Sequence, residues 1–421
     1  MIKNYMVLGG SYEQYVYISY LKNEYKNLNI ICLDQNKHCF SSNKVDIFYP
    51  IDIKNKIKVL KIAKKYKISG LSSVITEHAQ STIQFISKKM GFPLTSNESV
   101  RATNSKSYAK SKILEKNFFV KLKKNNTKLI NKLLRENDLV IKPDISSGQR
   151  GLTKVSKYTN PKIIIKKINE AIKLSANKNV IIEKYLKGTE VNVVALILDK
   201  KIHKFIFSKR LKFNSSNGFG IVYRHEYSNN ENLLLKEKIK EYLKKFIERY
   251  KLNNAVLFPQ FIFDKSNKLS LIEYGERVPG GKNMEMFFYS TGINLYDVNY
   301  RLSLNLNLNL RKFKKNKKYK FISIDFLNGK PGPLKNGKFK EIKFSKNSNL
   351  ENIIEHGVFD FKEDGYQEIK NLKTSIDRFY YFITGSNIRF NFKDNISKIF
   401  KNSSFLDIKK RSLKRISILN K

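Results

Sequence analysis

The stretch Glu273-Tyr274-Gly275-Glu276-Arg277 places a carboxylate and a guanidinium four residues apart. It follows a short apolar run, 268–272, which predicts a strand that ends at a glycine turn. The Glu273 carboxylate suits Mg²⁺, which prefers oxygen ligands and keeps part of its coordination shell for phosphate. The planar guanidinium of Arg277 binds a carboxylate or a phosphate. The stretch predicts adjacent sites for a metal ion and an anion, and a surface salt bridge beside a turn is the alternative.

A second candidate is a phosphate-binding segment around Lys142, which ends the apolar strand predicted over 139–143. The loop that follows contains Ser146, Ser147, Gly148 and Gly151. Small residues let backbone N–H groups approach phosphate oxygens closely, and the lysine supplies positive charge. The loop lacks the spacing of a P-loop. A hairpin with a solvated lysine is the simpler alternative.

A third candidate is a nucleoside-binding segment after the strand predicted over 180–182. Glu183-Lys184-Tyr185-Leu186 offers a carboxylate, backbone groups and apolar side chains, which can pair with the edge of a purine and cover its face. Glu190 begins the next strand, where its carboxylate can accept ribose hydroxyls. Alternatively, both glutamates are surface residues beside a hairpin.

The predicted strands 255–263 and 270–274 carry Gln260 and Glu273. If the two strands pair through the turn at 264–267, both side chains can point at one metal ion. Glutamine is the weaker magnesium ligand, so Glu273 would provide most of the binding.

Composition excludes several classes of protein. The chain has 421 residues, enough for two or three domains, and a formal net charge of +46. Lysine is spread along the whole chain, and Asn, Ile, Tyr and Phe are also abundant, which indicates a bias toward A/T-rich codons rather than a nucleic-acid surface. No run reaches the roughly 18 apolar residues of a membrane span. Cys32 and Cys39 are expected to be free thiols, and the basic tail at 409–415 a solvated terminal helix, with an amphipathic contact helix as the alternative.

Strand and helix alternate over the first 95 residues, which predicts a parallel sheet covered by helices. Gly9-Gly10 and Asp34 occur where a dinucleotide site would have them, but the full G-x-G-x-x-G pattern is missing. Residues 96–310 are predicted to form helices and antiparallel strands, and residues 311–421 a small lobe of mixed α/β structure. The expected fold class is therefore α/β and α+β: a Rossmann-like domain over 1–95, a central domain and a C-terminal α/β lobe.

Taken in order, these motifs resemble the ATP-grasp superfamily of carboxylate–amine ligases, in the branch of carbamoyl-phosphate synthase, biotin carboxylase and L-amino-acid ligase. The resemblance rests on Lys106 opening a helix, the strand at 140–143, the loop at 146–151, the segments at 183–186 and 188–190, Gln260, and Glu273 with Arg277. Gly275 stands where many members have an Asn that binds metal, which leaves open whether there are one or two metal sites.

The resemblance implies a role for each matched residue. Lys106 and Lys142 would contact the phosphates of ATP, and the loop that contains Ser146, Ser147, Gly148 and Gly151 would close over them. Glu183, Tyr185 and Leu186 would hold the adenine, and Glu190 the ribose. Gln260 and Glu273 would bind Mg²⁺, with Mn²⁺ as an alternative, while Arg277 would join Lys142 as a catalytic residue by steadying the substrate carboxylate.

The expected activity is that of an ATP- and Mg²⁺-dependent ligase. It would activate a small-molecule carboxylate as an acyl-phosphate for capture by an amine, as an amino-acid ligase does. His225, Lys209 and Arg210 are further candidates for substrate contacts. A cytoplasmic enzyme with no specific nucleic acid and no membrane span is expected, and a homodimer is compatible with the sequence. The alternatives are a degenerate nucleotide-binding scaffold or sensor without ligase turnover, and a basic nucleic-acid-binding protein.

Overall fold

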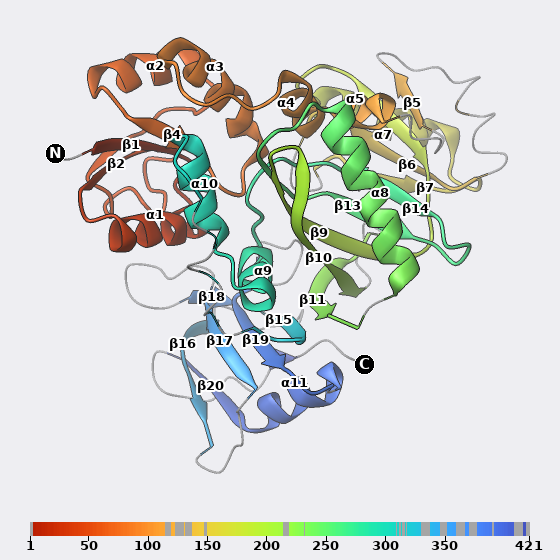
Figure 1. Cartoon of the computed structure of the whole chain (residues 1–421). Helices are drawn as coiled ribbons and strands as arrows, with labels where there is room; N and C mark the ends of the chain where they lie inside the picture. Colours follow the sequence, from red (N-terminus) through yellow and green to blue (C-terminus); the bar gives the residue numbers. More distant parts are fainter. Residues whose placement is uncertain are drawn as a thin grey trace.

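The structure, a computed structural model, is shown in Figure 1. It describes residues 3–113, 119–122, 130, 137–146, 150–213, 219–230, 232–308, 310, 313, 316, 318–329, 337–345, 352–358, 367–369, 377–389, 391–407 and 416–417.

The N-terminal part is a parallel sheet in the order β3-β2-β1-β4, with helices on its faces. Its elements are β1 (Lys3–Leu8), α1 (Tyr12–Glu24), β2 (Leu28–Leu33), β3 (Ile47–Tyr49), α2 (Lys56–Lys65), β4 (Gly70–Ser72), the short 3₁₀ helix η1 (Glu77–Ala79) and α3 (Gln80–Met90). β1 and β2 are apolar and buried almost throughout, as strands covered on both faces require. The expected parallel α/β organisation is therefore present.

A second, small antiparallel sheet has the order β5-β8-β6-β7. It contains β5 (Phe119–Leu122), β6 (Leu139–Pro143), β7 (Thr153–Val155) and β8 (Val180–Lys184), and α7 (Pro161–Leu174) packs against it. α4 (Asn97–Asn104) and α5 (Lys106–Lys112) connect this part to the N-terminal sheet. Pro161 occupies the first turn of α7, where its missing N–H costs no hydrogen bond.

The largest sheet runs in the order β14-β13-β9-β10-β11-β15-β19-β17, with β12 beside β9 and β21 beside β15. Its central strands are β9 (Thr189–Leu198), β10 (Lys201–Phe213), β11 (Ile221–Ser228), β12 (Ala255–Leu257), β13 (Gln260–Phe263) and β14 (Leu269–Glu273). α8 (Leu233–Arg249) covers one face, and α9 (Asn283–Thr291) and α10 (Leu295–Ser303) lie on the other, toward the N-terminal sheet (Figure 1).

The same sheet continues into the C-terminal lobe, drawn in blue in Figure 1. The lobe contributes β15 (Phe321–Gly329), β17 (Ile353–Val358), β19 (Tyr380–Ser386) and β21 (Ile416–Ser417) to it. A separate sheet of β16 (Gly337–Phe344), β18 (Gln367–Ile369) and β20 (Ser403–Asp407) packs with α11 (Phe392–Lys401). The basic tail expected as a helix over 409–415 lies outside the described residues.

The strand predicted over 255–263 is two strands, β12 and β13, because Pro259 lies between them and has no N–H to donate. Both strands pair with β9 all the same. Cys32 and Cys39 are free and buried, as expected. The Asp34 carboxylate accepts a hydrogen bond from Gly10 N at 2.8 Å, so it holds the turn that leads into α1.

Packing of α8 supports the strands that carry Gln260 and Glu273. The Phe246 ring is fully buried and lies 6.3 Å from the Phe261 ring and 5.0 Å from the Tyr274 ring, centroid to centroid. Phe261 and Tyr274 each follow one of the two strand residues directly in the sequence. The aromatic cluster therefore packs β13 and β14 against α8.

We expect Phe246→Ala to lower the free energy of unfolding by about 3–5 kcal/mol, because it leaves a cavity between α8 and the sheet. Denaturant unfolding followed by circular dichroism measures the change. Leu233, at the other end of the same helix, is 76% exposed, and Leu233→Ala is the matched control, with an expected change within about 0.5 kcal/mol. Equal effects of the two substitutions would contradict this view of α8.

Candidate active site

A cavity of about 340 Å³ lies between the small sheet and the edge of the large sheet. Side chains from β6, β8, β9, β10, β13, β14 and α5 line it. Nine of the residues predicted for the site are among them: Lys106, Lys142, Ser146, Glu183, Tyr185, Leu186, Glu190, Gln260 and Glu273. The topology therefore gathers residues that are far apart in the sequence around one space.

α5 directs two lysines into this cavity. The Ser105 hydroxyl caps the helix by accepting from Tyr108 N at 3.2 Å. Lys106 and Lys110 are four residues apart, so they lie on one face of the helix. Lys106 Nζ lies 3.1 Å from Glu273 and donates to Ser146 O at 2.8 Å. The helix thus links the glycine-containing loop to the strand that ends at Glu273.

Glu183 is held between two buried ammonium groups. Its carboxylate lies 2.7 Å from Lys142 Nζ and 3.0 Å from Lys110 Nζ. Burial raises the pKa of Glu183, but the charges of Lys110 and Lys142 outweigh burial, so the pKa lies below its ordinary value. Burial also lowers the pKa of Lys142, which the Glu183 charge counters only in part. Two cations share one carboxylate, which leaves positive charge for an anionic ligand.

The ribose-side candidate Glu190 is paired with two cations of β10. Its carboxylate lies 3.1 Å from Arg210 Nη1 and also contacts Lys212 Nζ. Arg210 Nη1 donates in addition to Gln260 Oε1 at 2.6 Å. Arg210 therefore connects the candidate ribose and metal residues.

Gln260 and Glu273 are direct cross-strand partners on β13 and β14, as the expected hairpin requires. Both residues line the cavity. Among the described residues, no cluster of three or more His, Cys, Asp or Glu side chains has the geometry to hold a metal ion. This donor set fits a Mg²⁺ ion that takes one carboxylate and one amide from the protein and its remaining ligands from phosphate and water.

Arg277 lies beyond the end of β14, in a second chamber that adjoins the first. Its Nε and Nη2 donate to Glu77 Oε1 at 3.1 and 2.8 Å. Glu77 belongs to η1 of the N-terminal sheet domain, so this pair joins two parts of the chain. Burial raises the pKa of Glu77, although the Arg277 charge opposes the shift. The guanidinium is thereby oriented beside Glu273.

Three further loop residues were predicted for the site. Ser147 and Gly148 lie outside the described residues, and Gly151 does not line the cavity. Gly151, whose φ is +74°, lies against Pro143 and Leu174. Any Cβ at this position would come within 2.9 Å of both neighbours, so the glycine is required by the local packing as well as by its φ.

Sequence reasoning missed Lys110 and Glu77, and it considered Arg210 only as a contact for the substrate. The spacing of Lys106 and Lys110 on a helix could have identified Lys110. Arg210 and Lys212 alternate on one strand, which places them on one face of the sheet. No local signal distinguishes Glu77, because its role depends on the packing of η1 against the turn after β14.

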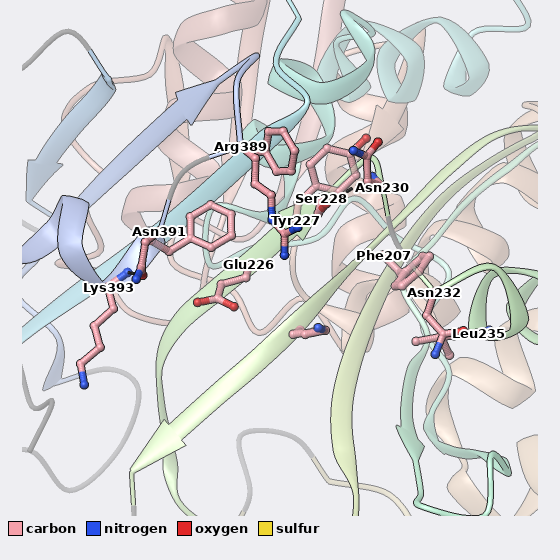
Figure 2. Close-up of a pocket in the computed structure, with 13 residues that line it drawn as sticks. Phe207, Glu226, Tyr227, Ser228, Asn230, Asn232, Leu235, Arg389, Asn391 and Lys393 are labelled. Atoms are coloured by element: carbon pink, nitrogen blue, oxygen red, sulfur yellow. Dashed lines mark hydrogen bonds between the residues drawn. The ribbon is translucent and has the colours of Figure 1, made fainter.

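A further cavity of about 640 Å³ lies on the opposite face of the large sheet (Figure 2). Lys209 and Glu226 line it, and these alternate along their strands with Arg210 and His225, which face the site. Figure 2 shows Arg389 extending into the same space from the C-terminal lobe. The residues of this cavity are separated from the site by the sheet itself.

Glu276 does not line the 340 Å³ cavity or the chamber that contains Arg277, and it is buried against α4. Its carboxylate accepts a hydrogen bond from Ser99 Oγ, and its backbone N–H donates to Thr103 Oγ1 at 3.0 Å. Burial raises the pKa of Glu276 to about 7, although the hydrogen bond from Ser99 acts in the opposite direction. The group is therefore a buried acid next to Arg277 in the sequence.

Comparison with known proteins supports the expected fold. Residues 104–280 match the family model described as phosphoribosylglycinamide synthetase, ATP-grasp (A) domain. The structure is similar to phosphoribosylglycinamide synthetase from Anaerococcus prevotii, with a TM-score of 0.73 and 19% identity over 97% of this chain and 100% of that chain. None of the curated proteins compared matches the sequence.

Two further solved structures are similar over nearly the whole chain. L-amino acid ligase from Bacillus licheniformis has a TM-score of 0.72 and 13% identity, covering 96% of this chain and 98% of that chain. N5-carboxyaminoimidazole synthetase from Staphylococcus aureus, complexed with ADP, has a TM-score of 0.69 and 12% identity, covering 95% and 96%. The ATP-grasp resemblance and the expected fold class are confirmed.

The raised pKa of Glu276 predicts how stability depends on pH. An unfolded glutamate loses its proton near pH 4.5, whereas folded Glu276 keeps its proton up to about pH 7. Glu276 therefore contributes most to the free energy of unfolding below pH 4.5. This contribution is lost as the pH rises through about 7, the pKa of the folded state. We expect Glu276→Gln to be more stable than the natural protein at pH 8 by about 3 kcal/mol, with the difference vanishing near pH 4. Denaturant unfolding at both pH values tests this, and a difference independent of pH would contradict it.

Proposed function

We propose that the chain is an ATP- and Mg²⁺-dependent ligase that activates a carboxylate as an acyl-phosphate for capture by an amine. The observation that carries the proposal is the convergence of Lys106 and Lys142, the cross-strand pair Gln260 and Glu273, and Arg277 on two adjoining cavities. The match of residues 104–280 to an ATP-grasp domain and the ADP and Mg²⁺ named with similar structures support it.

In this proposal the nucleotide lies in the 340 Å³ cavity. The adenine contacts Tyr185 and Leu186, while the Glu183 carboxylate stays between its two lysines. The ribose hydroxyls donate to Glu190, whose charge Arg210 and Lys212 balance. Lys106 and Lys142 bind the phosphates. Lys110 and Lys142 share the single carboxylate of Glu183, so positive charge remains for an anion to balance.

Gln260 and Glu273 would hold Mg²⁺, which would neutralise charge on the transferred phosphoryl group when bound. Glu273 pairs with Lys106 in this structure, so the same carboxylate orients a phosphate-binding lysine. Ser146 O accepts from the same ammonium group, which ties the loop to the reaction site. The ion pair thus positions the Lys106 ammonium group and the Glu273 carboxylate side by side before a nucleotide binds.

The chemistry requires no nucleophilic side chain. A carboxylate oxygen of the substrate, held by Arg277, attacks the γ-phosphorus, and the bond to the ADP oxygen breaks. The amine nitrogen then attacks the carbonyl carbon, phosphate leaves with the bonding electron pair, and the amine proton passes to phosphate or solvent. The fixed charges of Lys106, Lys142 and Arg277 stabilise the negative charge that develops at each step.

The scaffold alternative requires the same nucleotide site without turnover. It is disfavoured because Arg277, which ATP binding alone does not need, is largely buried and is oriented by its ion pair with Glu77. The enzyme would act on small molecules in the cytoplasm, as a monomer or a homodimer. Among the described residues, no helix is long and apolar enough to cross a membrane.

We expect Glu273→Gln and Arg277→Gln each to lower the rate of ADP release by about 100-fold or more, because each removes charge stabilisation from the transferred group. The assay uses Mg·ATP with a pool of carboxylates and amines, chiefly amino acids. Glu248→Gln, whose side chain is 70% exposed on α8, is the matched control and should leave the rate unchanged. Turnover at the natural rate in both site variants would overturn the assignment.

A further inference from the structure

The cavity of about 640 Å³ behind the large sheet forms a groove between the central sheet and the C-terminal lobe (Figure 2). β10, β11 and β15 line it together with the first turns of α8 and α11. None of the described residues that line it also lines the nucleotide cavity or the chamber that contains Arg277. A molecule bound in this groove would therefore lie outside the proposed reaction site, and its binding does not depend on the ligase function.

The groove carries positive charge that no described carboxylate balances. Three exposed groove cations line it, namely Lys209, Arg389 and Lys393. None of the three has an ion-pair partner among the described residues. Glu226, the acidic residue of the lining, is the cross-strand partner of Lys209, but its carboxylate pairs with Arg224 Nη1 at 3.4 Å. The groove is therefore suited to an anionic ligand.

Three large aliphatic side chains beside the groove are exposed to solvent and form an apolar rim. Leu233 and Leu234, at the start of α8, are 76% and 46% exposed, and Leu235 of the same turn lines the groove. Ile388, which precedes Arg389, is 80% exposed. Exposed aliphatic side chains beside a groove are typical of protein contact sites, because their removal from water stabilises a complex.

The exposed side chains favour a protein partner over the other candidates. A single-stranded nucleic acid would suit the groove cations, but its bases stack on exposed aromatic rings. The aromatic residues of the lining are buried or half-buried: Phe207, Tyr227, Phe321 and Phe392. A second copy of this chain is disfavoured, because each copy has a net charge of +46. A protein segment that carries both carboxylates and apolar side chains matches the groove cations and the apolar rim.

We propose that the groove binds an acidic segment of another protein. Carboxylates of the segment pair with the groove cations, and its large apolar side chains cover the apolar rim. Asn232 and Asn391 use their side-chain oxygens to cap α8 and α11, which leaves the Nδ2 group of each to donate to a peptide carbonyl. Charge complementarity of this kind speeds association and selects acidic partners over basic ones.

Fluorescence anisotropy on the full chain at physiological salt tests the inference. The probes are short labelled peptides in which Glu alternates with Leu, Gln with Leu, or Glu with Ser, and a labelled single-stranded RNA of the same length. We expect the Glu/Leu peptide to bind, and the other two peptides to bind at least about 10-fold more weakly, because each lacks one of the two kinds of contact. Equal affinities for the three peptides would overturn the inference, as would no binding of the Glu/Leu peptide.

Variants locate the charged contact. We expect replacement of all three groove cations, K209Q/R389Q/K393Q, to weaken binding of the Glu/Leu peptide about 10-fold or more. The matched control, K58Q/K61Q/K64Q, removes the same charge from exposed positions on α2 and should change the affinity by less than about twofold. Equal weakening by the two triple variants would contradict the proposal, because it would mean non-specific attraction to a cationic protein.

The apolar rim is tested separately. We expect L233S/I388S to weaken binding of the Glu/Leu peptide about 10-fold and to leave that of the Glu/Ser peptide unchanged, while I57S, at a residue that is 59% exposed on α2, has no effect. RNA that binds more tightly than every peptide, and is released by K209Q/R389Q/K393Q, would overturn the inference in favour of a nucleic-acid groove. A dimer that the same triple variant abolishes would overturn it in favour of a second copy of the chain.

Discussion

The site depends on keeping several ammonium and guanidinium groups charged in a place where water is largely excluded. A buried charge is costly unless a charge of opposite sign is close. Here each carboxylate pairs with at least one cation: Glu183 with Lys110 and Lys142, Glu273 with Lys106, and Glu77 with Arg277. These pairs position the cations, but the single charge of Glu183 cannot neutralise two lysines. A polyphosphate and a carboxylate substrate are ligands that would complete the balance of charge.

The continuity of the large sheet brings the parts of this network together. β9, β10 and β13 carry Glu190, Arg210 and Gln260 on one face, while the alternating residues on the other face pack against α8. The sheet continues through β11 and β15 into the C-terminal lobe, which places Arg378 across from Glu13 of the N-terminal domain. The second chamber therefore exists only because three parts of the chain meet at one sheet. The boundaries proposed at residues 95 and 310 stay predictions.

Local sequence patterns were sufficient for the fold class and for residues on strands with clear signals. Lys142, Glu183, Gln260 and Glu273 lie at strand ends, where apolar runs make the elements readable, and the structure brings all four to one cavity. Glu77 and Arg378 could not be assigned in this way, because each approaches the site from another part of the chain. Glu183 shows a further limit: its position was predicted, but its two lysine partners depend on the pairing of β8 with β6 and on the docking of α5. The break at Pro259 was overlooked although the residue signals it.

The central claim is that a substrate carboxylate is activated by phosphoryl transfer, and oxygen transfer reports this step directly. The measurement supplies Mg·ATP and amino acids whose carboxylates are labelled with ¹⁸O, and follows the label in the phosphate released, by mass spectrometry. An acyl-phosphate route leaves one carboxylate oxygen on each phosphate, so we expect singly labelled phosphate in step with ADP formation. Turnover that releases unlabelled phosphate would contradict the account, because ATP would then be cleaved by water.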